Sequence, residues 1–285
     1  MKIPYKIKFF NLLFAITVFG LFIGCSTQKI SILSYNIRYA NPNDGDNIWE
    51  NRKGAMIESL RKIHPSAIGM QEVVHSQLID LLNGMEEYSY VGVGREDGQK
   101  KGEYSPIFYQ KKQLELLESD TFWLSDTPDQ ITVGWDAALE RICTYARFKD
   151  KRSKEEFWLF NTHFDHVGEK ARANSVRLIM SKIETINQQQ LPVILTGDFN
   201  LTKDHEPIQY LMSTFEDVQQ HLNPEHKNYG TFTGFDTLSV EKRRIDYIFQ
   251  KGFTVLEADH LWLKTEKGLW VSDHHPVKTV LIVKK

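Results

Sequence analysis

The segment PVILTGDFNLTKD, residues 192–204, places a carboxylate and an amide directly after an apolar run. Side chains two residues apart on an extended chain point the same way. Asp198 and Asn200 are therefore expected to reach one small site together, with Phe199 turned into the core. Gly, Asp and Asn are also ordinary turn residues, so the segment taken alone fits a strand that ends in a polar turn equally well.

Polar residues of similar chemical types occur at the ends of other apolar segments. They are Asn36 in SYNIR, Glu72 in MQE, His163 in NTHFDH, Asp246 in RIDYIF, and Asp273 and His274 in SDHHP. Each has an ordinary structural role when taken alone, as a turn former, a solvated strand end, a core histidine or a loop cap. Burying all of them without partners is costly, and strand-end loops on a rigid scaffold are where sites are usually built. The set therefore predicts one site of carboxylate, amide and imidazole groups.

The segments between these residues predict one domain without repeats or low-complexity linkers. Strands are expected at 29–39, 67–73, 88–94, 104–110, 114–119, 141–148, 156–164, 193–195, 244–250, 253–263 and 275–283. Helices are expected at 47–65, where Trp49, Met56, Leu60 and Ile63 have the spacing of an amphipathic helix, and at 76–85, 169–188 and 207–212. Helices occur in both halves and short turns join most strands, which favours an α+β sandwich with antiparallel sheets over alternating βαβ units. Cys143, in the alternating segment RICTYARF, is expected to be a small core residue.

In this order, SYNIR, MQE, NTHFDH, LTGDFN, RIDYIF and SDHHP resemble the endonuclease/exonuclease/phosphatase superfamily. That group includes exonuclease III-type enzymes, pancreatic-type deoxyribonucleases, inositol polyphosphate 5-phosphatases and neutral sphingomyelinases. The resemblance covers nearly all of residues 29–285. It implies a four-layer α/β/β/α sandwich with two packed, mostly antiparallel sheets, and a divalent-metal phosphoesterase. TFWLS and RICTYAR further resemble a lipoprotein branch of this superfamily in gut-type bacteria.

Hydrolysis of a phosphate ester requires neutralised charge on the phosphate oxygens and a water aligned behind phosphorus. Mg²⁺ prefers carboxylate and amide oxygens. Glu72 is expected to be a metal ligand with Asn36 beside it, and the resemblance implies that Asp273 completes the cluster. Mn²⁺ is a possible substitute. The chain has no cysteine cluster and no HExxH motif, so a thiolate zinc site is not expected.

The remaining residues are expected to act on water and phosphate. Asp198 would orient or deprotonate the attacking water, and Asn200 would hold a phosphate oxygen. His274 would lie against the phosphate, with Asp246 fixing its tautomer. His163 would be a second imidazole on the phosphate or the leaving group. Which imidazole acts as the acid stays open.

Two further roles follow from the resemblance to the deoxyribonuclease branch. Glu103 in KGEYSPIFY matches a position that pairs with the second imidazole, and Arg141 matches a phosphate-contacting arginine. His275 precedes Pro276 and is biased to extended geometry, which allows it to turn away from the site, and it is not included among the site residues. His166 either lines the pocket or lies in a solvated loop.

The N-terminal segment differs in character from the rest of the chain. Lys2, Lys6 and Lys8 precede the apolar run LLFAITVFGLFIG, which is short for a membrane span and is followed by Cys25. This pattern resembles a bacterial lipoprotein signal, and an uncleaved anchor helix is the alternative. In either case a membrane-anchored protein outside the cytoplasm is expected, periplasmic or on the cell surface. The expected divisions are a signal peptide at 1–24, a short tether at 25–28 and the enzyme domain at 29–285.

Charge and composition bear on the substrate. Removal of residues 1–24 takes away three lysines and no acids, which changes the formal charge from −2 to −5. A body of that sign lacks the footprint of a tight nucleic-acid binder. A phosphatase or phosphodiesterase for small head groups or sugars is therefore favoured, with an extracytoplasmic nuclease as the alternative and a non-catalytic binding protein behind both. Trp123 and Trp135, within residues 119–140, either form a substrate rim or pack as a loop. A monomer is expected.

The location is testable through Cys25. Export and lipidation require this thiol, so Cys25→Ser should accumulate as an unprocessed precursor of higher mass than the mature wild-type protein. Mass spectrometry of the membrane fraction would measure the difference. Wild-type protein found in the cytoplasm with residues 1–24 still attached would contradict the interpretation.

Overall fold

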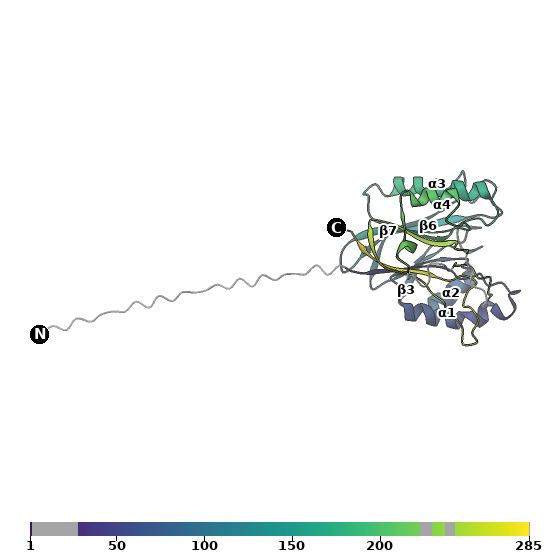
Figure 1. Cartoon of the computed structure of the whole chain (residues 1–285), viewed down its shortest axis with the longest axis horizontal. Coiled ribbons are helices and arrows are strands. Elements are labelled where there is room, and N and C mark those ends of the chain that lie inside the picture. Colours follow the sequence, from purple (N-terminus) through teal and green to yellow (C-terminus); the bar gives the residue numbers. More distant parts are fainter. Residues whose placement is uncertain (2–27, 223–229, 237–242, 285) are drawn as a thin grey trace.

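Two six-stranded sheets pack face to face, with helices on both outer faces (Figure 1). The computed structural model describes Met1 and residues 28–222, 230–236 and 243–284. The predicted signal peptide, apart from Met1, lies outside the described residues. In the view of Figure 1, α3 and α4 cover one sheet and α1 and α2 cover the other. The predicted four-layer α/β/β/α sandwich is confirmed.

The first sheet has the strand order β11-β12-β1-β2-β4-β3. Its strands are β1 Ile30–Asn36, β2 Ala67–Gln71, β3 Tyr88–Val91, β4 Ile107–Gln110, β11 Phe253–His260 and β12 Val277–Val283. Only β1 and β2 run parallel, and the other neighbours are antiparallel. The end of β1 and the end of β2 therefore lie at the same edge.

The second sheet has the order β5-β6-β7-β8-β10-β9. Its strands are β5 Leu114–Trp123, β6 Ile142–Asp150, β7 Glu156–His163, β8 Val193–Asp198, β9 Glu216–Asp217 and β10 Asp246–Lys251. Here β7 and β8 are the parallel pair, with His163 in register with Asp198. Because β10 runs antiparallel to β8, Asp246 at its start also lies opposite Asp198.

The helices were largely expected from the spacing of their apolar residues. They are α1 Trp49–Ile63, α2 His75–Gly84, α3 Glu169–Ile186 and α4 Glu206–Met212, with short 3-10 turns at Gly45–Asn47 and Val218–His221. Helix α1 buries Trp49, Met56 and Leu60 as predicted, leaves Ile63 half-buried, and ends at a left-handed His64 before Pro65. None of the helices in the described part of the chain is long and apolar enough to cross a membrane.

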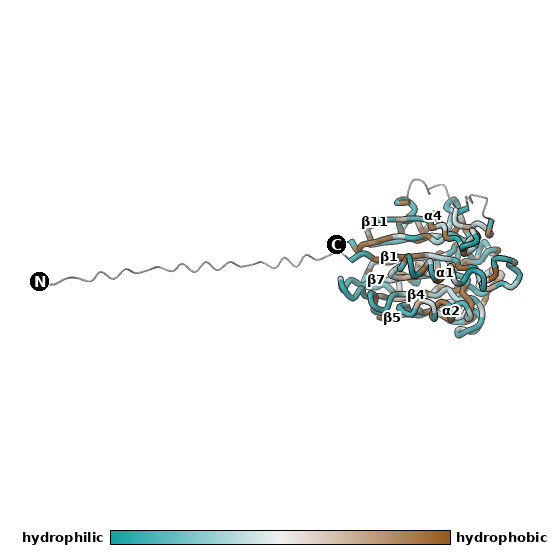
Figure 2. Tube along the Cα trace, turned by 90° about the horizontal axis from the view of Figure 1, so that it is seen from below, coloured by the Kyte–Doolittle hydropathy of each residue, from teal (hydrophilic) through white to brown (hydrophobic). Residues whose placement is uncertain are grey.

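Apolar side chains fill three layers, one between the sheets and one under each pair of helices. The strands in Figure 2 carry most of the hydrophobic colour, and the outer loops are hydrophilic. Cys143 is fully buried, as predicted, and its neighbours in the cluster under α3 are apolar. This packing leaves the strand ends as the place where polar side chains gather.

Asn161 on β7 joins the two sheets inside the core. Its amide nitrogen donates to the carbonyls of Met70 (2.7 Å) and Pro106 (3.0 Å) in the other sheet. Its oxygen accepts from Gln71 (2.7 Å) and Thr196 (3.0 Å). All four hydrogen-bonding positions of the amide are thus used in a site that is fully buried. This contact fixes β2 against β7 just beneath the strand ends.

Removing this amide should be strongly destabilising. Asn161→Ala removes four buried hydrogen bonds, two of them to carbonyls of the other sheet, and leaves a cavity, so the expected loss is about 3 kcal/mol in the free energy of unfolding. That corresponds to a decrease in Tm of roughly 6–12 °C for a domain of this size. Asn83→Ala, at an exposed position of α2, is the control and should change Tm by less than about 2 °C. Equal melting of both variants would contradict the cross-sheet role.

Candidate active site

The polar strand-end residues converge at one edge of the sandwich. Asn36 ends β1, Glu72 follows β2, and Asp198 ends β8, so both sheets contribute. The Asn36 amide nitrogen donates to Glu72 Oε1 (2.9 Å) and to Asp198 Oδ2 (3.0 Å). Its oxygen accepts from the backbone N–H of Arg38 at 3.0 Å. The predicted neighbours Asn36 and Glu72 are therefore in contact, and Asp198 of the opposite sheet joins them.

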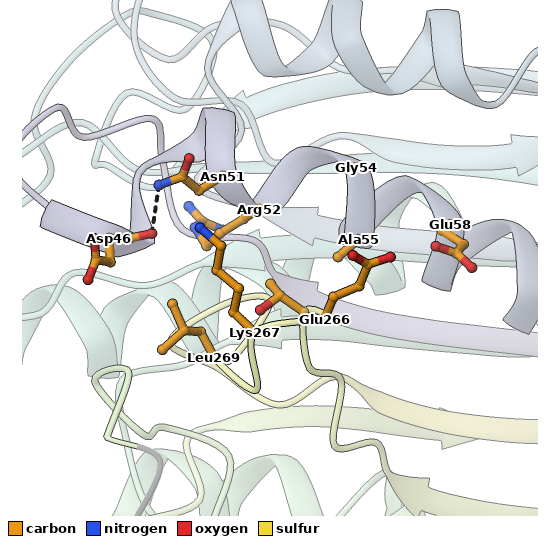
Figure 3. A pocket seen from close by; sticks show the side chains of 10 residues that line it. Asp46, Asn51, Arg52, Gly54, Ala55, Glu58, Glu266, Lys267 and Leu269 are labelled. Carbon is orange, nitrogen blue, oxygen red and sulfur yellow. Dashed lines mark hydrogen bonds between the residues drawn. The ribbon is translucent and has the colours of Figure 1, made fainter.

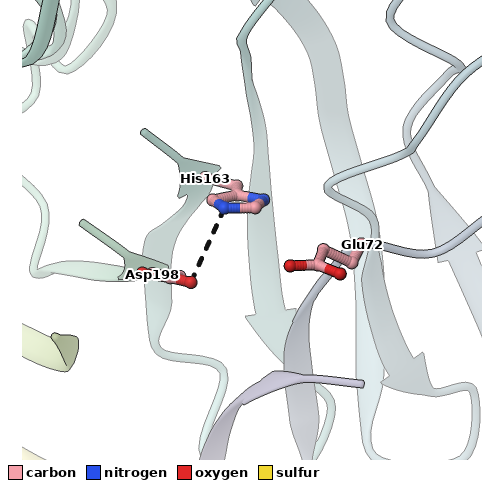
Figure 4. A group of neighbouring side chains, drawn as sticks. All are labelled: Glu72, His163 and Asp198. Atoms are coloured by element: carbon pink, nitrogen blue, oxygen red, sulfur yellow. Dashed lines mark ion pairs between the residues drawn. The ribbon is translucent and has the colours of Figure 1, made fainter. Parts of the chain in front are cut away.

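Asp198 is the centre of this arrangement. Its Oδ2 lies 3.6 Å from His163 Nε2 and 3.7 Å from His274 Nε2. Figure 4 shows Glu72 facing His163 and Asp198 from the neighbouring sheet. Burial, followed by the charge of Asp246, raises the pKa of Asp198 to about 7. A carboxyl group with such a pKa can exchange a proton near neutral pH, as a general base for water requires.

The acids of the site fit a divalent cation. Ligand atoms of Glu72, His163 and Asp198 lie within 4.8 Å of one another, as do those of Asp198, Asp246 and His274. Burial raises the pKa of Asp198 to about 7 and that of Asp273 to about 6, because the charged forms lose water and face other acids. A hard cation would relieve this penalty, and buried carboxylate and amide oxygens are suitable ligands.

Arg38 lies close to two of the predicted metal ligands, Asp273 and Glu72. Asp273 Oδ2 is 3.9 Å from Arg38 Nε, and Glu72 Oε2 is 4.0 Å from Arg38 Nη1. Arg38 is itself held by two hydrogen bonds of 2.9 Å to Asp44. The ligand set Glu72, Asn36 and Asp273 therefore remains a prediction, with a guanidinium close to two of its members.

His274 and Asp246 form a hydrogen-bonded pair across the two sheets. His274 Nδ1 donates to Asp246 Oδ2 at 2.8 Å, and both side chains are buried. Burial alone lowers the pKa of His274, but the charge and hydrogen bond of Asp246 and the charge of Asp198 outweigh it and raise the pKa to about 10. The imidazole is thus protonated at neutral pH, with Nε2–H directed near Asp198.

His163 has the opposite character. The amide of Asn200 lies 3.2 Å from its Nε2, so this nitrogen accepts and the proton is placed on Nδ1. Burial, then the charges of Arg141 and Arg95, lower its pKa well below the ordinary value. One buried histidine of the site is therefore charged and the other neutral, a separation that is typical of acid and base assignments.

The predicted partner of His163 is present but is shared. Glu103 Oε2 lies 3.9 Å from His163 Nδ1, which has no hydrogen-bond partner among the described residues. The same carboxylate receives two hydrogen bonds from Arg95, at 2.9 and 3.1 Å. Arg141 is buried beside it and pairs with Asp165 at 3.3 Å. Glu103 and Arg141 thus lie at the predicted site, while Arg95 was not expected.

The geometry of Asn200 corrects one expectation. Its φ of 50° is left-handed, so Asp198 and Asn200 are not successive same-side positions of an extended chain. The backbone turns instead, and the N–H of Asn200 donates to Asp198 Oδ1 at 3.0 Å. This turn carries the amide to the carbonyl of Phe164 (3.0 Å) and to His163. The two side chains reach one site, but the route predicted from the sequence was wrong.

The structure also shows the contacts of three residues outside the cluster that the sequence analysis discussed. His275 turns away and packs against Trp270, with ring centroids 4.6 Å apart. Trp123 is buried and donates its indole N–H to Arg95 O, and half-buried Trp135 donates to Asp126. For these two tryptophans the packed-loop interpretation therefore describes the structure better than an exposed rim.

Arg52 is a structural residue that the sequence did not reveal. This guanidinium, 1% exposed, donates to the carbonyls of Ile37 (2.9 Å), Val271 (2.7 Å) and Arg38 (3.2 Å). It fixes the chain around Arg38 to the segment before Asp273. Arg52 also lines a cavity of about 480 Å³ between α1 and residues 265–269 (Figure 3). None of the acids or histidines of the cluster lines that cavity.

Comparison with known proteins decides the family. A model of the Endonuclease/Exonuclease/phosphatase family matches residues 33–274. The chain belongs to this family. A solved structure of an endonuclease/exonuclease/phosphatase family protein from Bacteroides thetaiotaomicron is 36% identical, with a TM-score of 0.85 and coverage of 90% of this chain and 99% of that one.

Two other relatives differ in how much of this chain they cover. The structure of a Bacteroides thetaiotaomicron mannosyl-6-phosphatase is also 36% identical, with a TM-score of 0.84 and coverage of 89% and 99% of the two chains. An uncharacterized protein of Acanthamoeba polyphaga mimivirus is 31% identical over 159 residues, or 53% of this chain. The chain spans 59% of the length of that curated relative. The family resemblance inferred from the sequence is thus confirmed, but its lipoprotein branch stays a prediction.

A double-mutant cycle tests whether His274 and Asp246 act as one unit. His274→Ala should remove most of the activity, about 10²–10⁴-fold. Asp246→Asn should remove a large part, and the double variant should be little worse than His274→Ala because the losses are not additive. The pKa of His274 falls when the carboxylate is removed, so the alkaline limb of the pH–rate profile should move to lower pH in Asp246→Asn. Additive losses in kcat/KM would contradict this pairing.

Proposed function

We propose that the chain is a divalent-metal-dependent phosphoester hydrolase that acts on a small phosphorylated sugar or head group. The observation that carries this proposal is the position of Asp198, within 3.7 Å of a charged and of a neutral imidazole and joined through Asn36 to Glu72. Such a site contains a carboxylate that can accept a proton from water, an imidazolium that can bind phosphate, and acids that can bind a metal. It contains no serine or thiol nucleophile among these groups.

Each side chain has a role in this proposal. Glu72, Asn36 and Asp273 would hold Mg²⁺, or Mn²⁺ in its place, and the metal would supply positive charge to neutralise the phosphate oxygens. Asp198 orients the attacking water and accepts its proton. His274, protonated and fixed by Asp246, donates Nε2–H to a phosphate oxygen as negative charge develops.

The other face of the phosphate meets His163 and Asn200. The neutral imidazole receives a hydrogen bond from Asn200 at Nε2 and has a free Nδ1–H within the described residues. Arg141 binds a phosphate oxygen, and Glu103 stabilises the orientation of His163.

Substrate class is inferred from the solved relatives and from charge. A relative of 36% identity is a mannosyl-6-phosphatase, which favours a sugar phosphate for this chain. The formal charge of −5 for residues 25–285 disfavours a polynucleotide. The enzyme is further proposed to act outside the cytoplasm as a lipoprotein anchored at Cys25, on the basis of the sequence pattern of residues 2–28.

Metal dependence and substrate class are tested together. Phosphate release from mannose 6-phosphate should stop with a chelator and return with Mg²⁺ or Mn²⁺. Glu72→Gln should weaken metal binding, whereas Asp198→Ala should bind metal and lose about 10²–10⁴-fold in turnover. Lys112→Ala, at an exposed position between β4 and β5, is the control and should behave as wild type.

A second readout does not depend on turnover. Added Mg²⁺ should raise the Tm of chelated protein more at pH 8 than at pH 5. The pKa values of Asp198 (about 7) and Asp273 (about 6) exceed their ordinary values, so their ionisation destabilises the metal-free fold as the pH rises through them. Full activity in chelator, or release from DNA and RNA but from no small ester, would overturn the proposal.

A further inference from the structure

His166 lies beside the catalytic cluster and has no place in the roles described above. It follows Asp165 in the loop between β7 and α3, and its side chain is exposed. Arg141 Nη2 lies 3.1 Å from its Nδ1. It is close enough to the site that a positive charge on its ring would lower the pKa of His163, after the larger effects of burial, Arg141, Arg95 and His274.

The contact with Arg141 assigns the hydrogen-bonding roles of the two ring nitrogens. A guanidinium only donates hydrogen bonds, so Nδ1 of His166 must accept and cannot carry a proton. The neutral ring then carries its proton on Nε2. His166 therefore presents one N–H donor on an exposed imidazole whose other nitrogen is anchored.

The guanidinium of Arg141 has N–H donors that no described residue accepts. Its Nε donates to Asp165 Oδ2 at 3.3 Å and its Nη2 to His166, while Nη1 is buried without a partner in the described structure. The residue is 4% exposed. An unpaired buried N–H of a charged group is costly unless a ligand meets it. A phosphate oxygen supplies the missing acceptor, in agreement with the role proposed for Arg141.

The loop that carries His166 is fixed before any ligand arrives. Asp165 Oδ1 accepts from the backbone N–H groups of Val167 (3.0 Å) and Gly168 (2.8 Å). A Cβ at Gly168 would lie 2.6 Å from Asp136 O, so the loop packs directly on a neighbouring segment. The imidazole thus projects from a rigid turn, which reduces the entropic cost of binding through it.

We propose that His166 is a specificity-determining residue, and that its Nε2–H donates to a hydroxyl of the leaving alcohol while Arg141 binds the phosphate. This rests on the proposed function and narrows its substrate class to phosphate esters of polyhydroxylated alcohols, such as sugars. A neutral donor beside a phosphate-binding guanidinium suits a hydroxyl near the ester. It offers nothing to an aryl phosphate, which has no hydroxyl on the leaving group.

Two substitutions separate recognition from the support of Arg141. His166→Asn keeps an oxygen acceptor near the position of Nδ1 and loses the Nε2–H donor. His166→Ala loses both. His221→Asn, on the 3-10 turn Val218–His221 with its ring against Glu216, is the matched control. Both positions are exposed, so these variants should fold.

The kinetic test compares mannose 6-phosphate with phenyl phosphate in the presence of Mg²⁺. His166→Asn should raise KM for the sugar phosphate about fivefold, the effect of one neutral hydrogen bond, with kcat and phenyl phosphate hydrolysis nearly unchanged. His166→Ala should lower kcat/KM for both substrates, and His221→Asn should change neither. Equal losses on both substrates in His166→Asn, or no loss on either, would overturn the proposal.

A binding measurement separates this inference from the proposed function. Calorimetric titration of Asp198→Asn with mannose 6-phosphate and with inorganic phosphate gives the ratio of the two Kd values. The ratio should favour the sugar phosphate and fall about fivefold in the Asp198→Asn/His166→Asn variant. If wild type releases phosphate from neither mannose 6-phosphate nor phenyl phosphate, the proposed function is wrong, but the ratio of Kd values still tests the role of His166. An unchanged ratio refutes the role of His166 whatever the activity.

Discussion

The hydrogen bonds from the Asn36 amide to Glu72 and Asp198 are the contacts on which the geometry of the site depends. They join the end of β1 to an acid of its own sheet and to an acid of the opposite sheet. A lysine or arginine at this position would bind both carboxylates but would also cancel their charge. The neutral amide satisfies one oxygen of each acid and leaves the negative charge available for a cation. The same contact therefore holds the sheets together and keeps the site acidic.

The backbone around this site adopts conformations that cost folding free energy. Arg38, Glu72 and Asn200 all have left-handed φ values, between 50° and 59°. A non-glycine residue in this region costs roughly 1–2 kcal/mol. Each of the three is held by hydrogen bonds, including one from Tyr39 N–H to Glu72 Oε2 at 3.1 Å. Strain of this kind persists where surrounding contacts over-determine the backbone, and it gathers at sites that bind or react.

The sequence was most informative where periodicity and burial coincide. Alternation or continuous apolar character placed nearly every strand, and the spacing of Trp49, Met56 and Leu60 placed α1. Arg52 shows where this reasoning fails. Arg52 lies three positions after Trp49 and four before Met56, so helical spacing places it on the buried face of α1, where a charge is not expected. It can be buried because backbone carbonyls, some from distant segments, accept its protons. Those acceptors are brought together only by the tertiary fold.

The site residues also divide into those that the sequence indicated and those that only the tertiary fold brings together. Residue types and positions indicated Asn36, Glu72, Asp198 and His274, because a buried strand end seldom carries an acid, an amide or a histidine unless that group binds or reacts. The left-handed turn at Asn200 was not predictable, since an extended chain and a turn both bring its amide near Asp198. Arg95 was missed as well. Nothing in its local sequence indicates that its side chain binds Glu103 with two hydrogen bonds.

The position of the catalytic groups is set by how the two sheets pack. Polar contacts cross the interface at three places: at Asn161, which donates to the carbonyls of Met70 and Pro106 and accepts from Gln71, between Asn36 and Asp198, and between His274 and Asp246. The first lies in the core and the other two lie at the reactive edge. A small slide of one sheet over the other would lengthen all three together, because each donor and acceptor belongs to a different sheet. Side chains in a dense core resist such a slide. The fold thus fixes the distances on which proton transfer depends, and the opposite protonation of His163 and His274 follows from the neighbours that this packing gives them: arginines for one and aspartates for the other.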